Sequence, residues 1–253
     1  MTTPGVMIVD DEQPARNRLR ELLDDCRAEL PHRIVAEAAN GIEALDAVAS
    51  AGADVALVDI HMPGMSGIEF ARHLQLLPDP PAVVFVTAHD QYAVQAFEVN
   101  AIDYLLKPVR AARLLAALGK AIAGARVGRG VLERIDPHPR RFFSVAERGR
   151  ITLVPVAEAI YLKAGQKYVA VRTRGGEHLI EESLTLLEQE FADLFVRIHR
   201  NCLVARRLVR GFERGVETEG EAGWSVVLEG CDEHLPVSRR QWAQVKSLAK
   251  GSA

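Results

Sequence analysis

The polar residues best suited to chemistry in this sequence stand where short apolar runs end. Asp59 directly follows the apolar residues 55–58 and opens a loop, residues 59–67, that contains one proline and two glycines. Other apolar runs end in the same way, at Asp10 and Asp11, at Thr87 and at Lys107. A buried strand that leads straight into a turn-forming loop presents its terminal side chain at the edge of a sheet. The pattern therefore predicts that carboxylate, hydroxyl and ammonium groups meet at one edge.

The carboxylates in this set predict a metal site. Acidic side chains that converge repel each other, and a hard cation with oxygen ligands, Mg²⁺ in a cell, relieves that repulsion and keeps positions open for water and phosphate. We expect Asp11 and Asp59 to bind Mg²⁺ directly and Asp10 to act through water. The main-chain carbonyl of His61, just beyond Asp59 in the loop, is a further candidate ligand.

The whole set predicts phosphoryl chemistry centred on Asp59. If a phosphoryl group is transferred to its carboxylate, Lys107 and Mg²⁺ neutralise the phosphate oxygens, and the Thr87 hydroxyl donates a hydrogen bond. The acyl phosphate would then serve as a signal. A Mg²⁺-dependent phosphohydrolase with Asp59 as nucleophile is an alternative, but the sequence shows no evident substrate pocket and no separate general acid. We therefore expect a phosphoacceptor and not an enzyme.

A parallel sheet with covering helices would position these residues. Over the first 121 residues, short apolar runs alternate with amphipathic segments of helical period, which is typical of an α/β fold whose strands are covered on both faces. Pro14 is expected at the start of the first helix. In such folds ligands bind beyond the carboxyl ends of the strands. The expected strands are residues 6–9, 33–37, 55–58, 82–86 and 103–106.

Residues 1–121 resemble a response-regulator receiver domain, the phosphoacceptor partner of a sensor histidine kinase. The resemblance rests on the acidic pair at 10–11, the segment 57–64 around Asp59, the pair Thr87 and Ala88, and the pair Lys107 and Pro108. It implies a five-stranded, flavodoxin-like parallel sheet, Asp59 as the phosphoacceptor, and a Lys107–Pro108 peptide bond that is usually cis in the family.

The same resemblance gives roles to three further residues. Tyr104 occupies the position of the aromatic that turns inward when the switch threonine is drawn to the phosphate, and a half-buried strand tyrosine is the alternative interpretation. His61 and His89 stand at loop positions that influence the lifetime of the phosphate in receivers. Exposed loop residues without such a role are the alternative for both.

Composition limits the class of protein. A chain of 253 residues suits two domains, and 48% hydrophobic with 26% charged residues is typical of a folded chain. The sequence contains no apolar stretch long enough to span a bilayer and no signal-peptide pattern at its start, so we expect a cytoplasmic protein. Cys26, Cys202 and Cys231 lack metal-ligand spacing, and we expect them to be reduced packing residues.

Charge is divided unevenly along the chain. Residues 1–121 carry 10 Lys and Arg against 17 Asp and Glu, whereas residues 122–253 carry 21 against 17. An acidic first half suits a divalent cation, and a basic second half suits a polyanion. Between the two, residues 122–139 are rich in glycine, proline and arginine, which predicts a linker.

From residue 140 the pattern changes to a period of two, which predicts a mainly-β domain over residues 140–253. Only residues 183–191, capped by Ser183, and residues 241–250 have helical patterns. We therefore do not expect a helix-turn-helix DNA reader, and any DNA contact would come from loops and strand ends. The expected strands are residues 143–145, 151–156, 160–162, 168–171 and 224–228.

This second half resembles the LytTR DNA-binding domain from about residue 140 to residue 248. The resemblance rests on residues 195–204, with their Arg-x-His-Arg-Asn core, preceded by residues 160–169 and followed by residues 235–240. The pairing of the two domains resembles the LytR/AlgR group of transcriptional regulators. The residues at 87–90 and 197–201 are most similar to the AlgR branch.

In that family three loops contact bases in successive major grooves, and the matching positions are Lys167, Arg200 and Arg240. An arginine fork meets guanine O6 and N7 together, which gives about 1–3 kcal/mol of discrimination for each good pair. Asn201 and Arg239, together with Gln166 and Lys167, would instead hold phosphates and set the register. Solvated surface charge is the alternative for the basic residues, and some family members carry His and Asn at positions 167 and 200.

Two neighbouring residues favour a structural interpretation. Arg197 and His199 alternate with apolar residues of the predicted strand, so we expect them to serve its fold more than DNA binding.

The sequence as a whole predicts a two-component transcription regulator. Phosphorylation of Asp59 by a sensor histidine kinase would pair the receivers as a homodimer and place two DNA readers on spaced promoter repeats of double-stranded DNA. Two tethered readers bind better than one without any new base contact. The alternative keeps the receiver but makes the second half a protein-interaction module.

Overall fold

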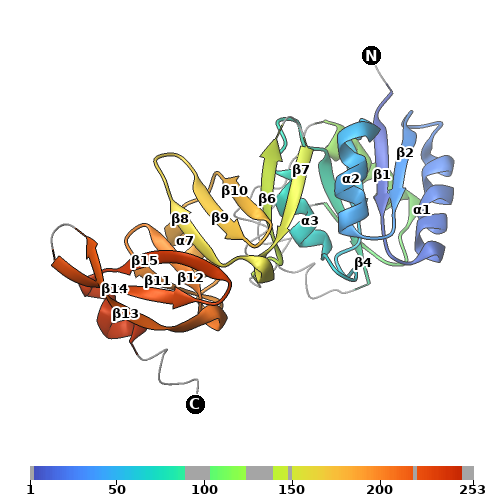
Figure 1. Ribbon diagram of the computed structural model, residues 1–253. Coiled ribbons are helices and arrows are strands. Elements are labelled where there is room, and N and C mark those ends of the chain that lie inside the picture. Colours follow the sequence, from blue (N-terminus) through green and yellow to red (C-terminus); the bar gives the residue numbers. More distant parts are fainter. Residues whose placement is uncertain (1–2, 89–102, 124–138, 148–149, 219–220, 247–253) are drawn as a thin grey trace. The chain divides into compact units, whose positions relative to one another are not determined.

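A computed structural model describes residues 3–88, 103–123, 139–147, 150–218 and 221–246 of the protein (Figure 1). The chain divides into two compact units, and each has a hydrophobic core. Most of the predicted linker and also His89 lie outside the described residues. In the part that is described, no helix is long and apolar enough to cross a membrane.

The first unit is built on a five-stranded parallel sheet with the strand order β2-β1-β3-β4-β5. This is the flavodoxin-like order that the resemblance to receivers implied. All residues of the inner strands β1 and β3 are buried, as expected of strands that are covered on both faces. The observed strands are β1 (Gly5–Val9), β2 (Arg33–Ala38), β3 (Val55–Val58), β4 (Ala82–Thr87) and β5 (Tyr104–Leu106).

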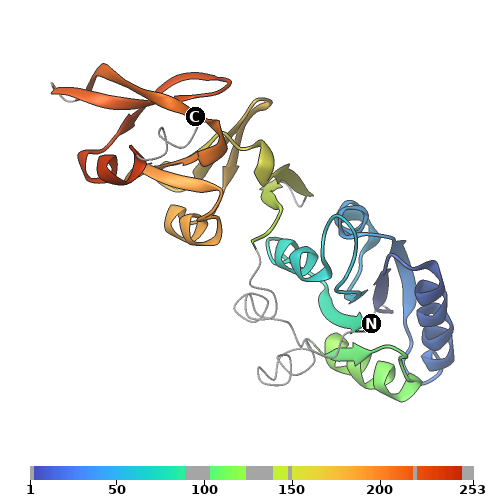
Figure 2. The same cartoon turned by 90° about the horizontal axis from the view of Figure 1, so that it is seen from below.

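Helices cover both faces of this sheet (Figure 2). Helices α1 (Gln13–Cys26) and α5 (Ala111–Ile122) contact each other, and α2 (Gly41–Ala51) contacts α3 (Gly67–Leu74). Pro14 lies in the first turn of α1, as predicted. The Asn40 side chain caps α2 by accepting a hydrogen bond from the Glu43 amide, and Ser66 caps α3 in the same way through Glu69.

The second unit is mainly β, as predicted. Its largest sheet has the order β10-β9-β8-β12-β11 and is antiparallel throughout. These strands are β8 (Tyr161–Ala164), β9 (Val169–Thr173), β10 (Gly176–Ile180), β11 (Phe195–His199) and β12 (Cys202–Ala205). A three-stranded sheet completes it, with β13 (Val209–Thr218), β14 (Glu221–Leu228) and β15 (Cys231–Val237). The two-stranded sheet of β6 (Phe142–Glu147) and β7 (Arg150–Pro155) is divided between the units, since residues 146–152 belong to the first.

Two short α-helices belong to this unit, α7 (Leu184–Glu190) and α8 (Arg239–Val245). Ser183 caps α7, as predicted, and Ser238 caps α8 by accepting from the Gln241 amide. Helix α8 therefore begins two residues earlier than its apolar pattern indicated. The short 3₁₀ helices η1 (Val156–Glu158) and η2 (Arg206–Leu208) follow β7 and β12.

Strands β10 and β13 were not predicted, and the structure shows why. Strand β10 lies at the edge of its sheet and alternates half-buried with exposed residues, so its apolar signal is weak; Leu179 is 49% exposed. Strand β13 contains Gly211 and Gly215 among charged residues, and glycine lowers the strand propensity. Both strands form because their neighbours supply the hydrogen bonds.

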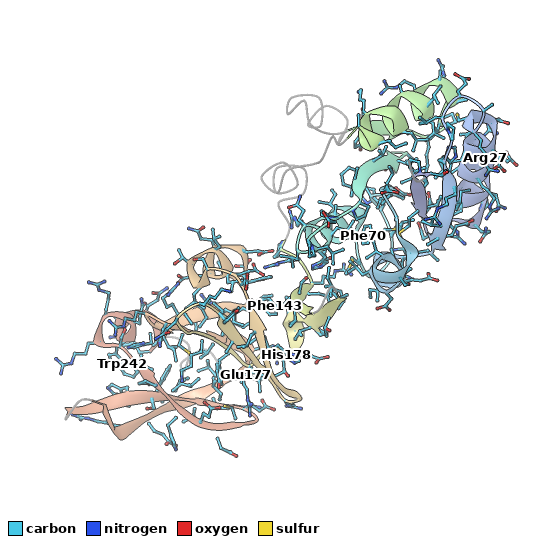
Figure 3. All side chains as sticks on the ribbon, turned by 90° about the horizontal axis from the view of Figure 1, so that it is seen from above. Arg27, Phe70, Phe143, Glu177, His178 and Trp242 are labelled. Atoms are coloured by element: carbon cyan, nitrogen blue, oxygen red, sulfur yellow. The ribbon has the colours of Figure 1, made fainter. Side chains whose placement is uncertain are left out.

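The core of the second unit joins segments that are far apart in the sequence. Phe143 lies inside this unit (Figure 3) and meets Phe191 edge to face, with ring centroids 5.4 Å apart. Phe191 makes a similar contact with Phe195 at 6.2 Å. Cys202 is buried here and Cys26 is buried in the first unit, while Cys231 is half-buried; all three are free cysteines, as expected.

Candidate functional site

The predicted carboxylates meet at the carboxyl end of the parallel sheet. Strands β1 and β3 are neighbours with Val9 opposite Val58, so the residues that follow, Asp10 and Asp59, are brought side by side. The Asp59 amide donates to the Val9 carbonyl at 2.8 Å, which continues the ladder by one residue. Together with Asp11, these residues hold carboxylate oxygens within 4.8 Å of one another. Asp10 and Asp59 are buried and Asp11 is exposed.

Lys107 completes the cluster from the end of β5. Its Nζ lies 2.7 Å from Asp10 Oδ2 and 2.8 Å from Asp59 Oδ2. The Lys107 amide donates to the Thr87 carbonyl at 2.8 Å, which fixes the backbone from which the side chain extends. The peptide bond to Pro108 is cis, as the resemblance implied.

Burial and charge act on this cluster in opposite directions. Burial raises the pKa of Asp10, although the hydrogen bonds from Lys107 and from the Glu12 amide lower it in part. For Lys107, burial acts to lower the pKa, but the hydrogen bonds and ion pairs with Asp10 and Asp59 outweigh it, and the pKa is raised. The ammonium therefore stays charged between the two buried carboxylates.

The donor set fits a divalent cation. Three carboxylates offer the hard oxygen ligands that Mg²⁺ prefers, and their convergence leaves them short of positive charge even with Lys107 present. The exposed side chain of Asp11 gives a cation access to the two buried ones. His61 follows in the loop, and its amide lies 3.3 Å from Asp59 Oδ1. The role of the His61 carbonyl as a ligand stays a prediction.

The loop after Asp59 requires glycine at two positions. A Cβ on Gly67 would lie 2.0 Å from the Asp59 carbonyl oxygen, so the chain approaches the predicted phosphoacceptor too closely for any side chain. The Gly67 amide donates to the Ile60 carbonyl at 2.9 Å and closes the loop. Gly64 has a φ of +79°, in the left-handed region. Sequence reasoning did not single out Gly67; the only signal was a glycine at the start of a helix that follows the acidic residue.

Thr87 and Tyr104 lie on neighbouring strands beside the cluster. Thr87 ends β4 opposite Leu106, and Tyr104 begins β5 opposite Phe85. Both side chains are buried. The Tyr104 carbonyl accepts a hydrogen bond of 3.5 Å from Arg113 on α5. The switch role that was predicted for these two residues stays a prediction.

In the second unit, the three predicted DNA-contacting segments gather at one end of the five-stranded sheet. The first is the turn between β8 and β9, which carries Lys167, and the second is the turn Arg200–Asn201 between β11 and β12. They adjoin because the Ala164 amide donates to the Asn201 carbonyl at 2.8 Å. The third is the start of α8, with Arg239 and Arg240.

A hydrogen bond joins α8 to this end of the sheet as well. The Ser238 amide donates to the Ile198 carbonyl at 2.8 Å, next to the end of β11. Segments separated by tens of residues thus present basic side chains at the same end of the sheet. The sequence indicated this grouping only through the resemblance to the LytTR domain.

The basic residues of these segments differ in how they are held. The Lys167, Arg200, Arg239 and Arg240 side chains are exposed. Lys167 Nζ lies 3.2 Å from Glu181 Oε1 and 4.9 Å from the centre of the Tyr168 ring. Asn201 is half-buried, and its Oδ1 lies 2.5 Å from His199 Nδ1, so this side chain helps to form its own turn.

Arg197 supports the turn that carries Arg200. Its Nη1 donates to the Arg200 carbonyl at 2.8 Å, and its Nε pairs with Glu188 at 2.7 Å. Together with the His199–Asn201 contact, this agrees with the structural role that we expected for Arg197 and His199.

An aromatic stack seats α8, and sequence reasoning did not identify it. Trp242 on α8 (Figure 3) stacks on Trp224 of β14 with ring centroids 4.4 Å apart and planes 10° apart. Phe212 of β13 meets Trp242 edge to face at 5.2 Å. Because Trp242 lies two residues after Arg240, the stack sets the position of the arginine pair at the start of the helix.

Comparison with known families covers both units. Residues 6–119 match the response regulator receiver domain, and residues 149–250 match the LytTr DNA-binding domain. The Positive alginate biosynthesis regulatory protein of Pseudomonas aeruginosa is 42% identical over 96% of this chain and 98% of its own length. The chain belongs to the LytTR response regulators.

Other relatives of this family share the same span. Sensory transduction protein LytT of Bacillus subtilis is 30% identical over 96% of this chain and 98% of its own length, and Transcriptional regulatory protein BtsR of Escherichia coli is 34% identical over 95% and 97%. Among solved structures, the response regulatory domain of mrkE from Klebsiella pneumoniae matches 47% of this chain and 95% of its own, with 31% identity and a TM-score of 0.41.

Family membership fixes the class of this LytTR response regulator. It is a two-component regulator of transcription that joins a receiver to a DNA-binding domain, and its relative BtsR is named a transcriptional regulatory protein. The receiver domain coincides with the parallel sheet and its acidic cluster. The LytTR domain coincides with the mainly-β unit and its three gathered segments.

Proposed function

We propose that this regulator accepts a phosphoryl group on Asp59 from a sensor histidine kinase in the cytoplasm and then binds promoter repeats through the three segments of its LytTR unit. One observation carries the first half of the proposal: Lys107 bridges Asp10 and Asp59 with contacts of 2.7 and 2.8 Å. The working domains would be residues 1–121 and 140–253, joined by a linker at 122–139. The protein would act as an acceptor and a DNA-binding protein, not as an enzyme.

Each residue of the receiver site has a role in this proposal. The Asp59 carboxylate is the nucleophile, and Lys107 moves from its ion pair to the new phosphate oxygens. The Thr87 hydroxyl donates to the phosphate, and Tyr104 takes up the space that Thr87 leaves. Mg²⁺, when bound, neutralises charge on the phosphoryl group, and Asp10, Asp11, Asp59 and the His61 carbonyl would hold it.

The DNA-binding half of the proposal rests on the three gathered segments. Arg200, Arg240 and Lys167 would read bases in successive major grooves, since exposed arginine forks fit guanine edges. Arg239 would bind phosphate and set the register. The Asn201 side chain contacts His199, so its part in the proposal is to hold the turn as well as to contact the backbone.

Phosphorylation would act through pairing of two receivers. Repacking around Thr87 and Tyr104 alters the outer surface near β5, and a homodimer then places two LytTR units on spaced half-sites. The second unit binds at an effective concentration set by the linker, so affinity for the double site rises without any new base contact.

Binding to duplex DNA tests the LytTR half directly. The full chain is titrated with genomic DNA fragments across a salt series, together with Arg200→Ala, Arg240→Ala and the control Arg174→Ala. Arg174 is an exposed arginine beyond β9, at the opposite end of the sheet. We expect sequence-selective binding that weakens steeply with salt, because about six phosphate contacts release counterions. It should be lost only in Arg200→Ala and Arg240→Ala; absence of DNA binding would favour a protein-interaction module.

Labelling by a small-molecule phosphodonor tests the receiver half. Asp59→Asn should abolish incorporation and leave the fold intact, as judged by circular dichroism. Asp46→Asn on α2 is the matched control, because Asp46 is an exposed aspartate away from the cluster, and it should label like the parent. Persistent labelling of Asp59→Asn would show that another residue is the acceptor.

A further inference from the structure

The LytTR unit contains an apolar groove that the DNA-binding site does not use. It is a cavity of about 640 Å³, lined largely by apolar side chains that include Phe142, Pro155, Val156, Leu194 and Phe195. Leu194 stands in the turn before β11 and is 46% exposed, so it adds apolar surface that faces solvent at the cavity. We call this cavity the Leu194 groove.

Strand register places the Leu194 groove at the opposite end of the sheet from the DNA-contacting segments. Phe195, which begins β11, pairs with Ala205 at the end of β12, and both line the groove. At the other end of the same two strands, His199 pairs with Cys202 beside the Arg200–Asn201 turn. A molecule in the groove would therefore leave the DNA-contacting segments accessible.

Two arginines stand at the groove with their guanidinium groups already anchored. Arg206 Nε donates to the carbonyls of Ala192 and Phe195 at 3.1 and 3.0 Å. Arg207 Nη2 donates to the Ala159 carbonyl at 3.4 Å and also to that of Ala157. These contacts use one nitrogen of each fork.

The charge at the groove is not balanced by the described part of the chain. Neither Arg206 nor Arg207 forms an ion pair with any described carboxylate, and Asp193 is the single acidic residue among the described groove-lining residues. Arg140 and Arg141 also line the groove, and Glu182 and Glu190 already pair with Arg140 at 2.7 and 3.1 Å. The groove thus joins an apolar floor to two cationic forks held in place.

We propose that the Leu194 groove binds a peptide segment of a partner protein, one that carries both acidic and apolar side chains, while the LytTR unit is bound to DNA. Carboxylates of the segment would meet the remaining N–H groups of Arg206 and Arg207, which suit bidentate pairing. Its apolar side chains would cover Leu194 and Phe195, as an amphipathic helix does in a hydrophobic groove. The partially exposed leucine favours a peptide laid across the groove over a small ligand, since small-ligand sites enclose most of their ligand.

The test measures binding of designed peptides to the full chain by fluorescence anisotropy. The acidic probe is a labelled helical peptide of about twelve residues, three turns, with leucines four positions apart and glutamates on the flanks. Its twin carries lysine in place of every glutamate. We expect the acidic probe to bind about tenfold more tightly than the twin, because the twin loses a pair of charge-assisted contacts.

Variants locate the binding and reverse its charge preference. Leu194→Glu should weaken the acidic probe by about tenfold or more, because it buries a like charge against the peptide. Leu186→Glu on α7 is the matched control: Leu186 is 55% exposed and does not line the groove, so binding should not change. Arg207→Glu should move the preference from the acidic probe to the lysine twin, which a merely unfolded variant cannot do.

This inference rests on the proposed DNA-binding function, and the DNA titration separates the two. Leu194→Glu and Arg207→Glu should bind DNA like the parent, because the groove lies at the far end of the sheet. Equal binding of both probes, no binding of either, or an acidic probe that is indifferent to Leu194→Glu would overturn the proposal. Loss of DNA binding in the parent chain would instead count against the proposed function.

Discussion

The ammonium group of Lys107 lies 2.8 Å from the Asp59 carboxylate, although the two residues are 48 positions apart in the sequence. The same ammonium lies 2.7 Å from Asp10, which is fully buried. The receiver therefore holds the proposed phosphoacceptor in an ion pair that an incoming phosphoryl group would have to rearrange. The parallel sheet creates this relationship, because it brings the ends of β1, β3 and β5 to one edge.

Lys107→Met should raise the affinity of the receiver for Mg²⁺ by about tenfold, because a positive charge beside the same carboxylates repels the incoming cation. Isothermal titration calorimetry at neutral pH measures this. Lys120→Met is the control, since Lys120 Nζ pairs with Asp103 at 2.7 Å on the exposed side of α5 and should leave Mg²⁺ affinity unchanged. Weaker Mg²⁺ binding by Lys107→Met would contradict the account of the site.

Asp10→Asn should raise the free energy of unfolding at neutral pH by about 1 kcal/mol, because burial disfavours the charged carboxylate. Burial raises the pKa of Asp10 above its usual 3.8. The cost of the buried charge is present above the raised pKa and disappears as the pH falls through it, since the parent carboxyl then takes up a proton. The advantage of the variant should therefore shrink between neutral pH and about pH 4.

Calorimetric unfolding in Mg²⁺-free buffer at the two pH values checks this dependence. Asp11→Asn is the comparison, because the Asp11 side chain is exposed and its neutralisation should change stability by less than about 0.5 kcal/mol. An Asp10→Asn advantage that grows as the pH falls would have the wrong sign for a buried carboxylate.

Gly67→Ala should destabilise the receiver by about 2–3 kcal/mol and slow phosphodonor labelling of Asp59. Its Cβ would lie 2.0 Å from a backbone atom, the Asp59 carbonyl oxygen, so the acceptor itself must shift. Gly64→Ala in the same loop should cost only about 1 kcal/mol, because it adds left-handed strain at φ +79° without a contact within 4 Å. Equal labelling rates in the two variants would argue against the idea that the close contact of Gly67 with the Asp59 backbone positions the Asp59 side chain.

Arg140→Ala should destabilise the LytTR unit by about 3–5 kcal/mol, since it removes the buried cation that pairs with Glu182 and Glu190. The Arg140 and Glu182 side chains are each 6% exposed. Both tryptophans of the chain lie in this unit, so fluorescence during urea unfolding reports on it alone. Arg210→Ala breaks an exposed pair with Glu229 and should cost less than about 1 kcal/mol.

Trp242→Ala should weaken specific DNA binding by about tenfold, because the stack with Trp224 positions the start of α8. Trp242→Phe keeps an aromatic contact and should lose less. A double-mutant cycle separates positioning from general damage: once Trp242 is removed, Arg240→Ala should add little further loss. Full additivity of the two substitutions would show that the stack does not act through Arg240.

Much of the receiver could be predicted from the sequence because its determinants are local. Asp59 and Lys107 each end an apolar run, and a strand end is visible in a few consecutive residues. The mainly-β nature of the second half followed from its period of two, and the strand order of the first half followed from the resemblance to receivers.

What the sequence did not reveal depends on contacts between distant residues. Glu182 and Glu190 meet Arg140 across 42 and 50 positions, and no local pattern marks such a buried pair. The stack of Trp242 on Trp224 and the closeness of Gly67 to Asp59 likewise arise only when separate elements pack together. Edge strand β10 was not predicted because it contains few buried apolar residues.

The central claim is that phosphate on Asp59 raises the affinity of the LytTR unit for paired DNA sites. The most direct measurement compares DNA binding by the full chain with and without a phosphodonor and Mg²⁺, in the parent, Asp59→Asn and Arg200→Ala. We expect the phosphodonor to tighten binding by about tenfold or more in the parent, through the effective concentration of a tethered second reader. Asp59→Asn should bind weakly under both conditions, and Arg200→Ala should not bind specifically. A phosphodonor effect that persists in Asp59→Asn, or none in a parent that is labelled at Asp59, would contradict the account.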